Sequence, residues 1–259
     1  MSIAPTQHKH RLPKAQALLL SLPDPEHQST TWESAFASAA ERVLHGLELI
    51  IFGKRFRLVE VEFYLTSDAH PDPFTHLHEV QRAFGQWYLH RQGSGYRGGS
   101  FKGLDLTFGD GQAFGGMLLR SIEADSGEFI CGPSLIVDAI LRQSPYNSVA
   151  ELDRRLDGVG AWTEQALIQL RETDAPTGDV YRSARVGLGG GRGSGSRDLF
   201  ADRSYRFLSE PRLVKKGRPE LIRQMHRDGY SAAQIREITG SPRHTIMRRI
   251  GSEPTANSV

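Results

Sequence analysis

Two carboxylates and a tyrosine alternate along one short stretch of this chain, and they are the residues best placed to do chemistry. The stretch Arg57–Leu65 reads RLVEVEFYL, the alternation typical of a strand. Glu60, Glu62 and Tyr64 share one face of this predicted strand. The opposite, apolar face is expected to carry Val59, Val61, Phe63 and Leu65. Because an unpaired buried carboxylate costs several kcal/mol, the strand is either an edge with a solvated acidic face or a carrier of a general base into a pocket walled by Tyr64.

Length and composition limit the setting of this strand. The chain has 259 residues, of which 38% are hydrophobic, enough for one large domain with a core and a small module. Its one cysteine, Cys131, excludes an intramolecular disulfide and indicates a reducing compartment. No apolar run approaches the ~20 residues of a membrane span, and no small-residue cleavage site follows the short apolar run near the N-terminus. We therefore expect a cytoplasmic protein without a membrane partner.

The pattern along the chain predicts an arm, a body, a small module and a tail. Their expected bounds are 1–28, 29–214, 215–251 and 252–259. In the body, a capping box of Thr30 and Glu33 would begin a helix that ends near Gly46. Further helices are predicted at 134–142 and 148–157, and strands at 47–52, 57–65, 85–90, 104–108, 116–122, 180–188 and 205–208. The glycine-rich segment 187–196 is expected to be a loop within the body.

The predicted C-terminal module is basic and helical. Between Arg212 and Ile250 ten Lys or Arg stand against three Asp or Glu, a net charge of +7, which leaves −5 for the rest of a chain with a total of +2. Helical patterns cover 219–228, 231–239 and 242–250, and Gly240 would supply the left-handed turn between the last two. The last helix carries the side chains expected to contact DNA, which are Arg243, His244, Thr245, Arg248 and Arg249.

This module resembles the helix-turn-helix of DNA invertases and resolvases. The shared features are Gly217-Arg218-Pro219, Gly240, and the run from Thr245 to Arg248, whereas Arg236 replaces the usual small residue of the second helix. The resemblance implies that double-stranded DNA is a partner. The alternative is a solvated basic helical tail.

Four ordered segments of the body are similar to the alkyladenine (3-methyladenine) DNA glycosylase family. They are 57–64, the MLLRSIE of 117–123, the CGPS of 131–134, and the ARVGLG of 184–189 followed by the YRF of 205–207. The resemblance implies an α+β fold, with a curved, mostly antiparallel sheet flanked by helices. It also implies an enzyme that flips a nucleotide out of DNA and hydrolyses its N-glycosidic bond without a metal, a covalent lysine intermediate or any cofactor.

The resemblance assigns roles to individual residues. Glu62 matches the general base that activates water, and Arg120 matches the arginine that holds that water and the carboxylate. Val186 matches the residue whose backbone carbonyl completes the water site, and Tyr64 matches an aromatic wall of the base pocket. A carboxylate suits this reaction because glycosidic cleavage develops positive charge on the sugar.

Departures from the family bear on the substrate. Members of the family insert a tyrosine into the duplex, and here Tyr96, Arg97 or Phe101 would take its place. Lys102 follows them on the hairpin that is expected to face DNA. Asp105 stands where the family has an asparagine that screens purines, and the second stacking tyrosine has no clear match. A carboxylate accepts a hydrogen bond from an exocyclic amine such as cytosine N4. We therefore expect a modified pyrimidine, such as the glucosylated hydroxymethylcytosine of phage DNA, and hence a role in anti-phage defence.

A polar loop follows the strand 57–65. It contains Asp68, His70, Asp72, His76, His78 and Glu79. Of these, Asp68, His70 and His76 are predicted to line the rim of the base pocket. A metal site is the less favoured interpretation, because the spacing matches no known ligand pattern. A structural, hydrogen-bonded loop remains an alternative.

Three hypotheses follow for the whole chain. The first is a monofunctional glycosylase with an added DNA-docking module, acting on the modified pyrimidine or on an alkylated or deaminated purine. The second is a non-catalytic regulator or reader of modified DNA. The third is a metal-dependent nuclease or other hydrolase that uses the His/Asp loop, and sensitivity of its activity to a chelator would favour this hypothesis.

Overall fold

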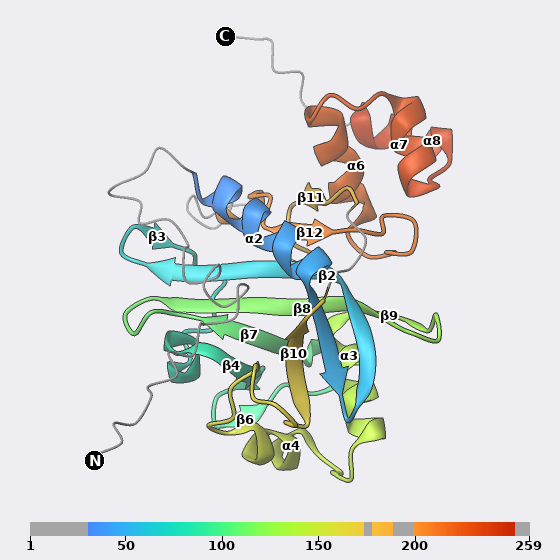
Figure 1. Cartoon of the computed structure of the whole chain (residues 1–259). Helices are drawn as coiled ribbons and strands as arrows, with labels where there is room; N and C mark the ends of the chain where they lie inside the picture. The colour runs from blue at the N-terminus through green and yellow to red at the C-terminus, as the bar shows by residue number, and fades with distance from the viewer. Residues whose placement is uncertain (1–30, 174–177, 189–198, 252–259) are drawn as a thin grey trace, which may run out of the picture.

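The computed structural model describes residues 31–173, 178–188 and 199–251 and has an α+β fold (Figure 1). An antiparallel sheet runs through the body with helices packed on it, and three further helices lie at the C-terminal end. The predicted fold class is therefore confirmed. The predicted arm and tail lie outside the described residues, as do Thr30 and most of the glycine-rich segment.

The sheet has a central path of six strands. In spatial order these are β10 (Ile168–Glu172), β1 (Leu47–Ile51), β2 (Lys54–Ser67), β8 (Phe114–Ala124), β7 (Leu104–Phe108) and β4 (Phe84–Leu89). Short strands pair beside the path: β3 (His70–Pro71) and β12 (Arg206–Leu208) with β2, β9 (Phe129–Cys131) with β8, and β11 (Tyr181–Ser183) with β12. A separate hairpin is formed by β5 (Arg91–Gln92) and β6 (Gly95–Tyr96).

Helices of the body close its hydrophobic core. They are α2 (Trp32–Gly46), α3 (Pro133–Gln143) and α4 (Val149–Leu156), together with the short 3-10 helices η1 (Glu79–Arg82) and η2 (Gly99–Phe101). The apolar side of α2 packs on β2, where Phe36 stacks on Phe63 with ring centroids 4.8 Å apart. Both rings are fully buried, which contributes roughly 1.5–3 kcal/mol for each.

The start of α2 differs from the prediction. Its N-cap is Thr31, whose side chain accepts a hydrogen bond from the backbone N–H of Ser34. The capping pair is therefore shifted by one residue from Thr30 and Glu33. The Glu33 carboxylate instead accepts a hydrogen bond from Arg203. A threonine at either position satisfies the same sequence rule, so only the backbone decides which one caps.

A bulge in β2 changes which residues face the core. The pairing with β8 runs Leu58 to Ile122, then Glu60 to Ser121, then Val61 to Leu119, so it shifts twice around Val59 and Glu60. The core cluster accordingly includes Leu58 and Val61 but not Val59, which is buried elsewhere. The predicted core face was thus wrong at Val59, because strict alternation cannot reveal an extra residue in a strand.

Two other strand predictions need correction. Strand β10 was missed, although it pairs with β1 along its whole length. The predicted strand 180–188 is limited to Tyr181–Ser183. Beyond it the chain leaves the ladder, because the Arg185 guanidinium binds Asp72 and the backbone N–H of Val186 donates to Glu62.

The C-terminal module consists of α6 (Arg218–Arg227), α7 (Ala232–Thr239) and α8 (Arg243–Ile250). Gly240, with φ +66°, ends α7 in the left-handed conformation, as predicted. The module's small core includes Leu221, Ile235 and Ile246, and it continues into the body through Leu208 of β12 and Val214. The predicted boundary at residue 215 therefore runs through a shared core.

Candidate active site and DNA-facing surface

One row of paired residues crosses five strands and carries the candidate site. The pairings join Arg206 of β12 to Glu62, Glu62 to Leu118, Leu118 to Asp105, and Asp105 to Tyr88 of β4. Directly paired residues of antiparallel strands share a face. Arg206, Glu62, Asp105 and Tyr88 are therefore displayed together on the face opposite Val61 and Phe63, although they are up to 144 positions apart in the numbering.

Glu62 is fully buried and its carboxylate is held by three donors. Oε1 accepts from the backbone N–H of Val186 at 2.7 Å, and Oε2 accepts from the Tyr64 hydroxyl at 2.8 Å and from Arg120 Nη1 at 3.2 Å. The predicted pairing of Glu62 with Arg120 is thus present. Val186 is also brought to Glu62, and the contact is made by its N–H.

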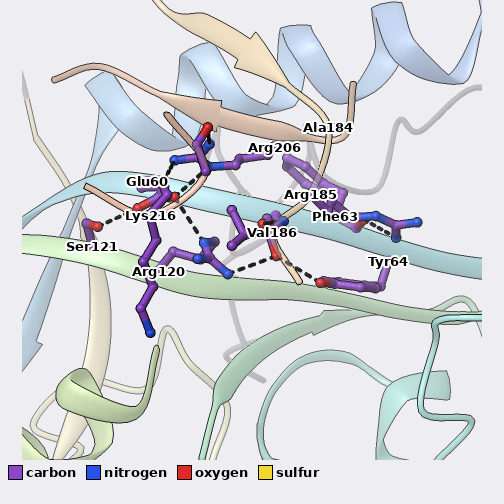
Figure 2. Close-up of polar contacts among 12 residues, drawn as sticks. Glu60, Phe63, Tyr64, Arg120, Ser121, Ala184, Arg185, Val186, Arg206 and Lys216 are labelled. Carbon is purple, nitrogen blue, oxygen red and sulfur yellow. Dashed lines mark hydrogen bonds and ion pairs between the residues drawn. The ribbon is translucent and has the colours of Figure 1, made fainter. Parts of the chain in front are cut away.

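A second buried carboxylate, Glu60, fixes the orientation of Arg120 (Figure 2). Glu60 Oε1 accepts from Arg120 Nε at 3.0 Å and from Arg206 Nε at 2.6 Å, and its Oε2 accepts from Ser121 Oγ at 2.5 Å. Burial raises the pKa of Glu60, but Arg206 and Arg120 outweigh this and hold it below its ordinary value. Two carboxylates and two guanidinium groups therefore balance each other inside the fold.

Arg206 links this network to the C-terminal module. Its Nη1 donates to the carbonyl of Gly217 and its Nη2 to the carbonyl of Lys216, both at 2.9 Å. Gly217, with φ +73°, permits this contact, because a Cβ there would lie 2.3 Å from Arg206 Nη1. The segment that begins α6 is therefore bonded to the same buried charges that position Arg120.

Tyr64 is fixed from two sides. Its hydroxyl donates to Glu62, and the Arg185 guanidinium lies over its ring at 4.4 Å from the centroid. Arg185 is itself held by Asp72, a buried pair of opposite charge. Burial and the Glu62 carboxylate raise the pKa of Tyr64 well above its ordinary value, so the phenol keeps its proton and remains a donor.

A cavity of about 820 Å³ opens above these groups. Tyr64, Arg120 and Val186 line it, together with Leu118 and Lys216. Glu62 has no exposed surface and lies directly beneath its three donors. Burial lowers the pKa of Arg120, but Glu62 and Glu60 more than offset this and raise it above its ordinary value, so the Arg120 guanidinium at the cavity floor keeps its proton.

The opposite wall of the cavity is rich in imidazole and phenol rings. His78 stacks on Tyr88 with centroids 5.0 Å apart, and His76 Nδ1 lies 3.2 Å from the Tyr88 hydroxyl. Burial lowers the pKa of His76 to about 4 and raises the pKa of Tyr88 to about 12, so both are neutral near pH 7. Asp105 lies on this wall as well, paired with His90.

These rings correct two sequence-based expectations. Tyr88, His78 and His90 were not predicted as site residues, and the stretch 85–90 gave no indication beyond a strand. The pocket thus has a second aromatic wall, which the sequence did not reveal. The unmatched second stacking tyrosine is therefore no reason to expect a modified pyrimidine. The carboxylate of Asp105 does line the cavity, as expected.

Two predicted rim residues lie elsewhere. His70 is buried in the core, where Nδ1 contacts the carbonyl of Leu65 and Nε2 contacts the Tyr205 hydroxyl, each at 2.8 Å. Asp68 is exposed in the turn before β3 and does not line the cavity. Only His76 of the three reaches the cavity, because the short β3 pairing turns His70 inward under α2.

The candidate wedge residues differ in how freely they project. The Tyr96 hydroxyl donates to Asp153 at 2.7 Å, and Lys102 pairs with Asp138, so both are anchored. Arg97 and Phe101 line the cavity, and Phe101 is 70% exposed. Leu77, on the opposing loop, also lines the cavity and is 53% exposed, with an unusual φ of +57°.

The predicted recognition helix α8 presents a basic outer surface. Arg243, His244 and Arg248 are exposed, whereas Thr245 and Arg249 are half-buried. Ile246 packs inward beside Ile235. The exposed side chains are therefore the ones available to a nucleic acid.

The described residues offer neither a metal cage nor a membrane span. Within them, no group of three or more His, Cys, Asp or Glu side chains is arranged to hold a metal ion. None of the helices in 31–173, 178–188 and 199–251 is both long enough and apolar enough to cross a membrane.

Comparison with known proteins gives a viral relative. No family model matches the chain. The chain is similar to "Uncharacterized protein L759" of Acanthamoeba polyphaga mimivirus, with 28% identity over 212 residues that cover 76% of this chain and 95% of the viral protein. The name of that protein assigns it no activity.

Proposed function

We propose that this protein is a monofunctional DNA glycosylase that hydrolyses the N-glycosidic bond of a modified nucleotide flipped out of the duplex. The observation that supports this most strongly is the Glu62–Arg120 pair beneath a cavity of about 820 Å³. A carboxylate held in place by a guanidinium is a suitable general base that can take a proton from water. The similarity of the surrounding segments to alkyladenine DNA glycosylases agrees with this role.

The hydrogen bonds of Glu62 define how water would be activated. Oε1 accepts one hydrogen bond in the described structure, from Val186, and a carboxylate oxygen has a second lone pair. A water placed there would give its proton to Glu62 and its oxygen to C1′ of the sugar. Arg120 would fix the carboxylate, and the Glu62 side chain would stabilise the positive charge that develops on the sugar.

The surface around the cavity suits a duplex. Phe101 is the exposed aromatic at the rim, and we propose it as the wedge that fills the space left by the flipped nucleotide. The helix-turn-helix would bind the same duplex through Arg243 and Arg248 and add affinity. The proposed DNA partner thus rests on the exposed aromatic side chain at the cavity rim and on the basic surface of α8.

Two substrate classes fit the cavity. Its volume lies toward the upper end of the roughly 300–1,000 Å³ typical of ligand pockets, which leaves room for a base enlarged by a sugar, such as glucosylated hydroxymethylcytosine. The stacked Tyr88–His78 wall, facing Tyr64, favours an alkylated or deaminated purine as the second candidate. The first class implies anti-phage defence and the second implies repair.

The decisive experiment is mass spectrometry of bases released from alkylated, deaminated and phage-modified DNA. We expect release of a free base and no strand cleavage until the abasic sites are treated with alkali. The Glu62→Gln variant should release the base about 1,000-fold more slowly, because the amide has nearly the same shape but cannot take a proton from water. DNA binding by this variant should be unchanged, as measured by fluorescence anisotropy.

A matched control is Glu41→Gln, which alters an exposed carboxylate of α2. It should release base at the wild-type rate. If no modified DNA yields a free base while binding to modified DNA is tight, the protein is a reader and the glycosylase proposal is wrong. Activity that a chelator removes would favour the nuclease instead.

A further inference from the structure

A histidine–carboxylate pair on the far wall of the cavity has no part in activating water. His90 Nε2 lies 2.7 Å from Asp105 Oδ1, and both residues line the cavity. Asp105 is only 2% exposed, so its carboxylate is held in place within the sheet. The pairing puts Nε2 on the carboxylate and leaves Nδ1 as the other polar atom of the ring.

His90 Nδ1 has no hydrogen-bond partner among the described residues, and it is not one of their fully buried polar atoms. The ring packs on Gly103, where a Cβ would lie 2.5 Å from Nδ1 and Cε1. Glycine at this position therefore gives the ring room to pack against the backbone. Because His90 also lines the cavity, the tertiary structure presents an oriented imidazole there.

The sheet register sets the distance between this pair and the candidate base. Glu62 and Asp105 flank Leu118 on adjacent strands, so their Cα atoms lie about 10 Å apart, two strand spacings. Hydrolases that cleave a glycosidic bond with a separate acid and base place those groups on opposite sides of the bond. A nucleotide over Leu118 would have Glu62 on one side and His90 on the other.

We propose that His90, oriented by Asp105, is the general acid that protonates the departing base. This inference rests on the proposed glycosylase function. As the C1′–N bond breaks, its electron pair stays with the base, and the imidazolium gives its Nδ1 proton to a ring nitrogen or carbonyl oxygen of that base. Water adds its oxygen to C1′ and gives a proton to Glu62, and exchange with solvent then restores both groups. Asp105 holds the ring in place through its contact with Nε2.

If His90 is the acid, its removal should affect the release of neutral bases and of positively charged bases differently. A neutral base that is not protonated must leave as an anion, which is a poor leaving group. An alkylated cationic base leaves as a neutral molecule. The acid therefore accelerates only the first. Removal of His90 should slow release of neutral bases by about 100-fold and change release of cationic bases by less than about threefold.

The experiment measures single-turnover release from duplexes that contain one modified base. The neutral and cationic members are hypoxanthine and 7-methylguanine for purines, and glucosylated hydroxymethylcytosine and 3-methylcytosine for pyrimidines. His90→Gln and Asp105→Asn should lower the neutral-to-cationic rate ratio, whereas Glu62→Gln should slow both members alike. His45→Gln, a histidine of α2 outside the cavity lining, is the matched control for loss of an imidazole.

Chemical rescue covers the case in which the enzyme releases only a neutral base. The cavity has room for a free imidazole where His90→Ala removes the ring, so added imidazole should raise the variant's rate at least about tenfold. An equal loss on both members of a pair, or no rescue in a variant with a normal melting temperature, would overturn the acid role while leaving the glycosylase proposal intact. Release of cationic bases alone would also overturn it. No release from any duplex by the wild-type protein rejects the glycosylase proposal itself.

Discussion

The body and the helix-turn-helix module are built on opposite principles. The body buries a network of acidic and basic side chains that includes Glu60, Glu62, Arg120 and Arg206, from strands far apart in sequence. The module packs a few aliphatic side chains and is shaped by local features, such as the Ser231 capping box and Gly240. The body is therefore expected to be sensitive to loss of single charges, and the module to backbone changes.

The two regions meet at Arg206, and its removal should have the largest effect on stability. Arg206→Met would leave Glu60 with one guanidinium fewer and would remove the donor to the carbonyls of Lys216 and Gly217. We expect a loss of about 3–5 kcal/mol in the free energy of unfolding, measured by urea denaturation. In contrast, Arg171→Met removes a side chain that is 57% exposed and paired with Glu48, and it should cost less than about 1 kcal/mol. Equal losses in both variants would show that the buried network does not hold the two regions together.

Substitutions in α8, the proposed recognition helix, should change DNA binding rather than stability. Arg243→Ala combined with Arg248→Ala removes two exposed cations, and we expect DNA affinity to fall at least about tenfold. The slope of log affinity against log salt should become shallower by roughly one for each phosphate that is no longer neutralised. Fluorescence anisotropy at several salt concentrations measures both quantities, with Arg155→Ala of α4 as the exposed control. Unchanged affinity would identify the module as a structural extension of the body.

Gly240 tests whether the module depends on local conformation. A Cβ at this position would meet only Arg212 Cγ at 3.9 Å, so space is available and the cost of Gly240→Ala comes from φ +66°. We expect a loss of about 1 kcal/mol in the free energy of unfolding. The control is Gly46→Ala, a position with open space and no positive φ, which should be neutral or stabilising by up to about 1 kcal/mol. Similar effects at both positions would contradict a conformational role for Gly240.

The pH dependence of stability should come from the buried imidazoles of the body. Burial lowers the pKa of folded His76 from 6.5 to about 4, so the unfolded chain binds a proton first as the pH falls. His76 should have no effect on stability above about pH 6.5 and should reduce stability progressively between there and about pH 4. His76→Gln should make that decline shallower in thermal melts across this range. His226 and His244 of the module are exposed, and their substitution should leave the decline unchanged.

The sequence correctly predicted those structural features that depend only on residues close together in the chain. Gly240, the strand Leu104–Phe108 and the helices around 134–142 and 148–157 follow from turn chemistry and periodicity, which act over a few residues. Glu62 and Arg120 were identified through the similarity of short segments to a known family. The structure places Arg120 Nη1 3.2 Å from Glu62 Oε2. The bulge at Val59 and the inward turn of His70 were missed, since each depends on a partner strand.

The sequence by itself determined that this chain has an alternating strand with paired carboxylates and a basic helical module at its end. Only the tertiary structure decided that Tyr88, Asp105 and His90 line the same cavity as Tyr64 and Arg120, and that Arg206 bonds both Glu60 and the start of α6. The reason is physical. Local patterns encode periodicity and turns, whereas a catalytic cavity depends on strand register, and register is fixed only when distant strands pair.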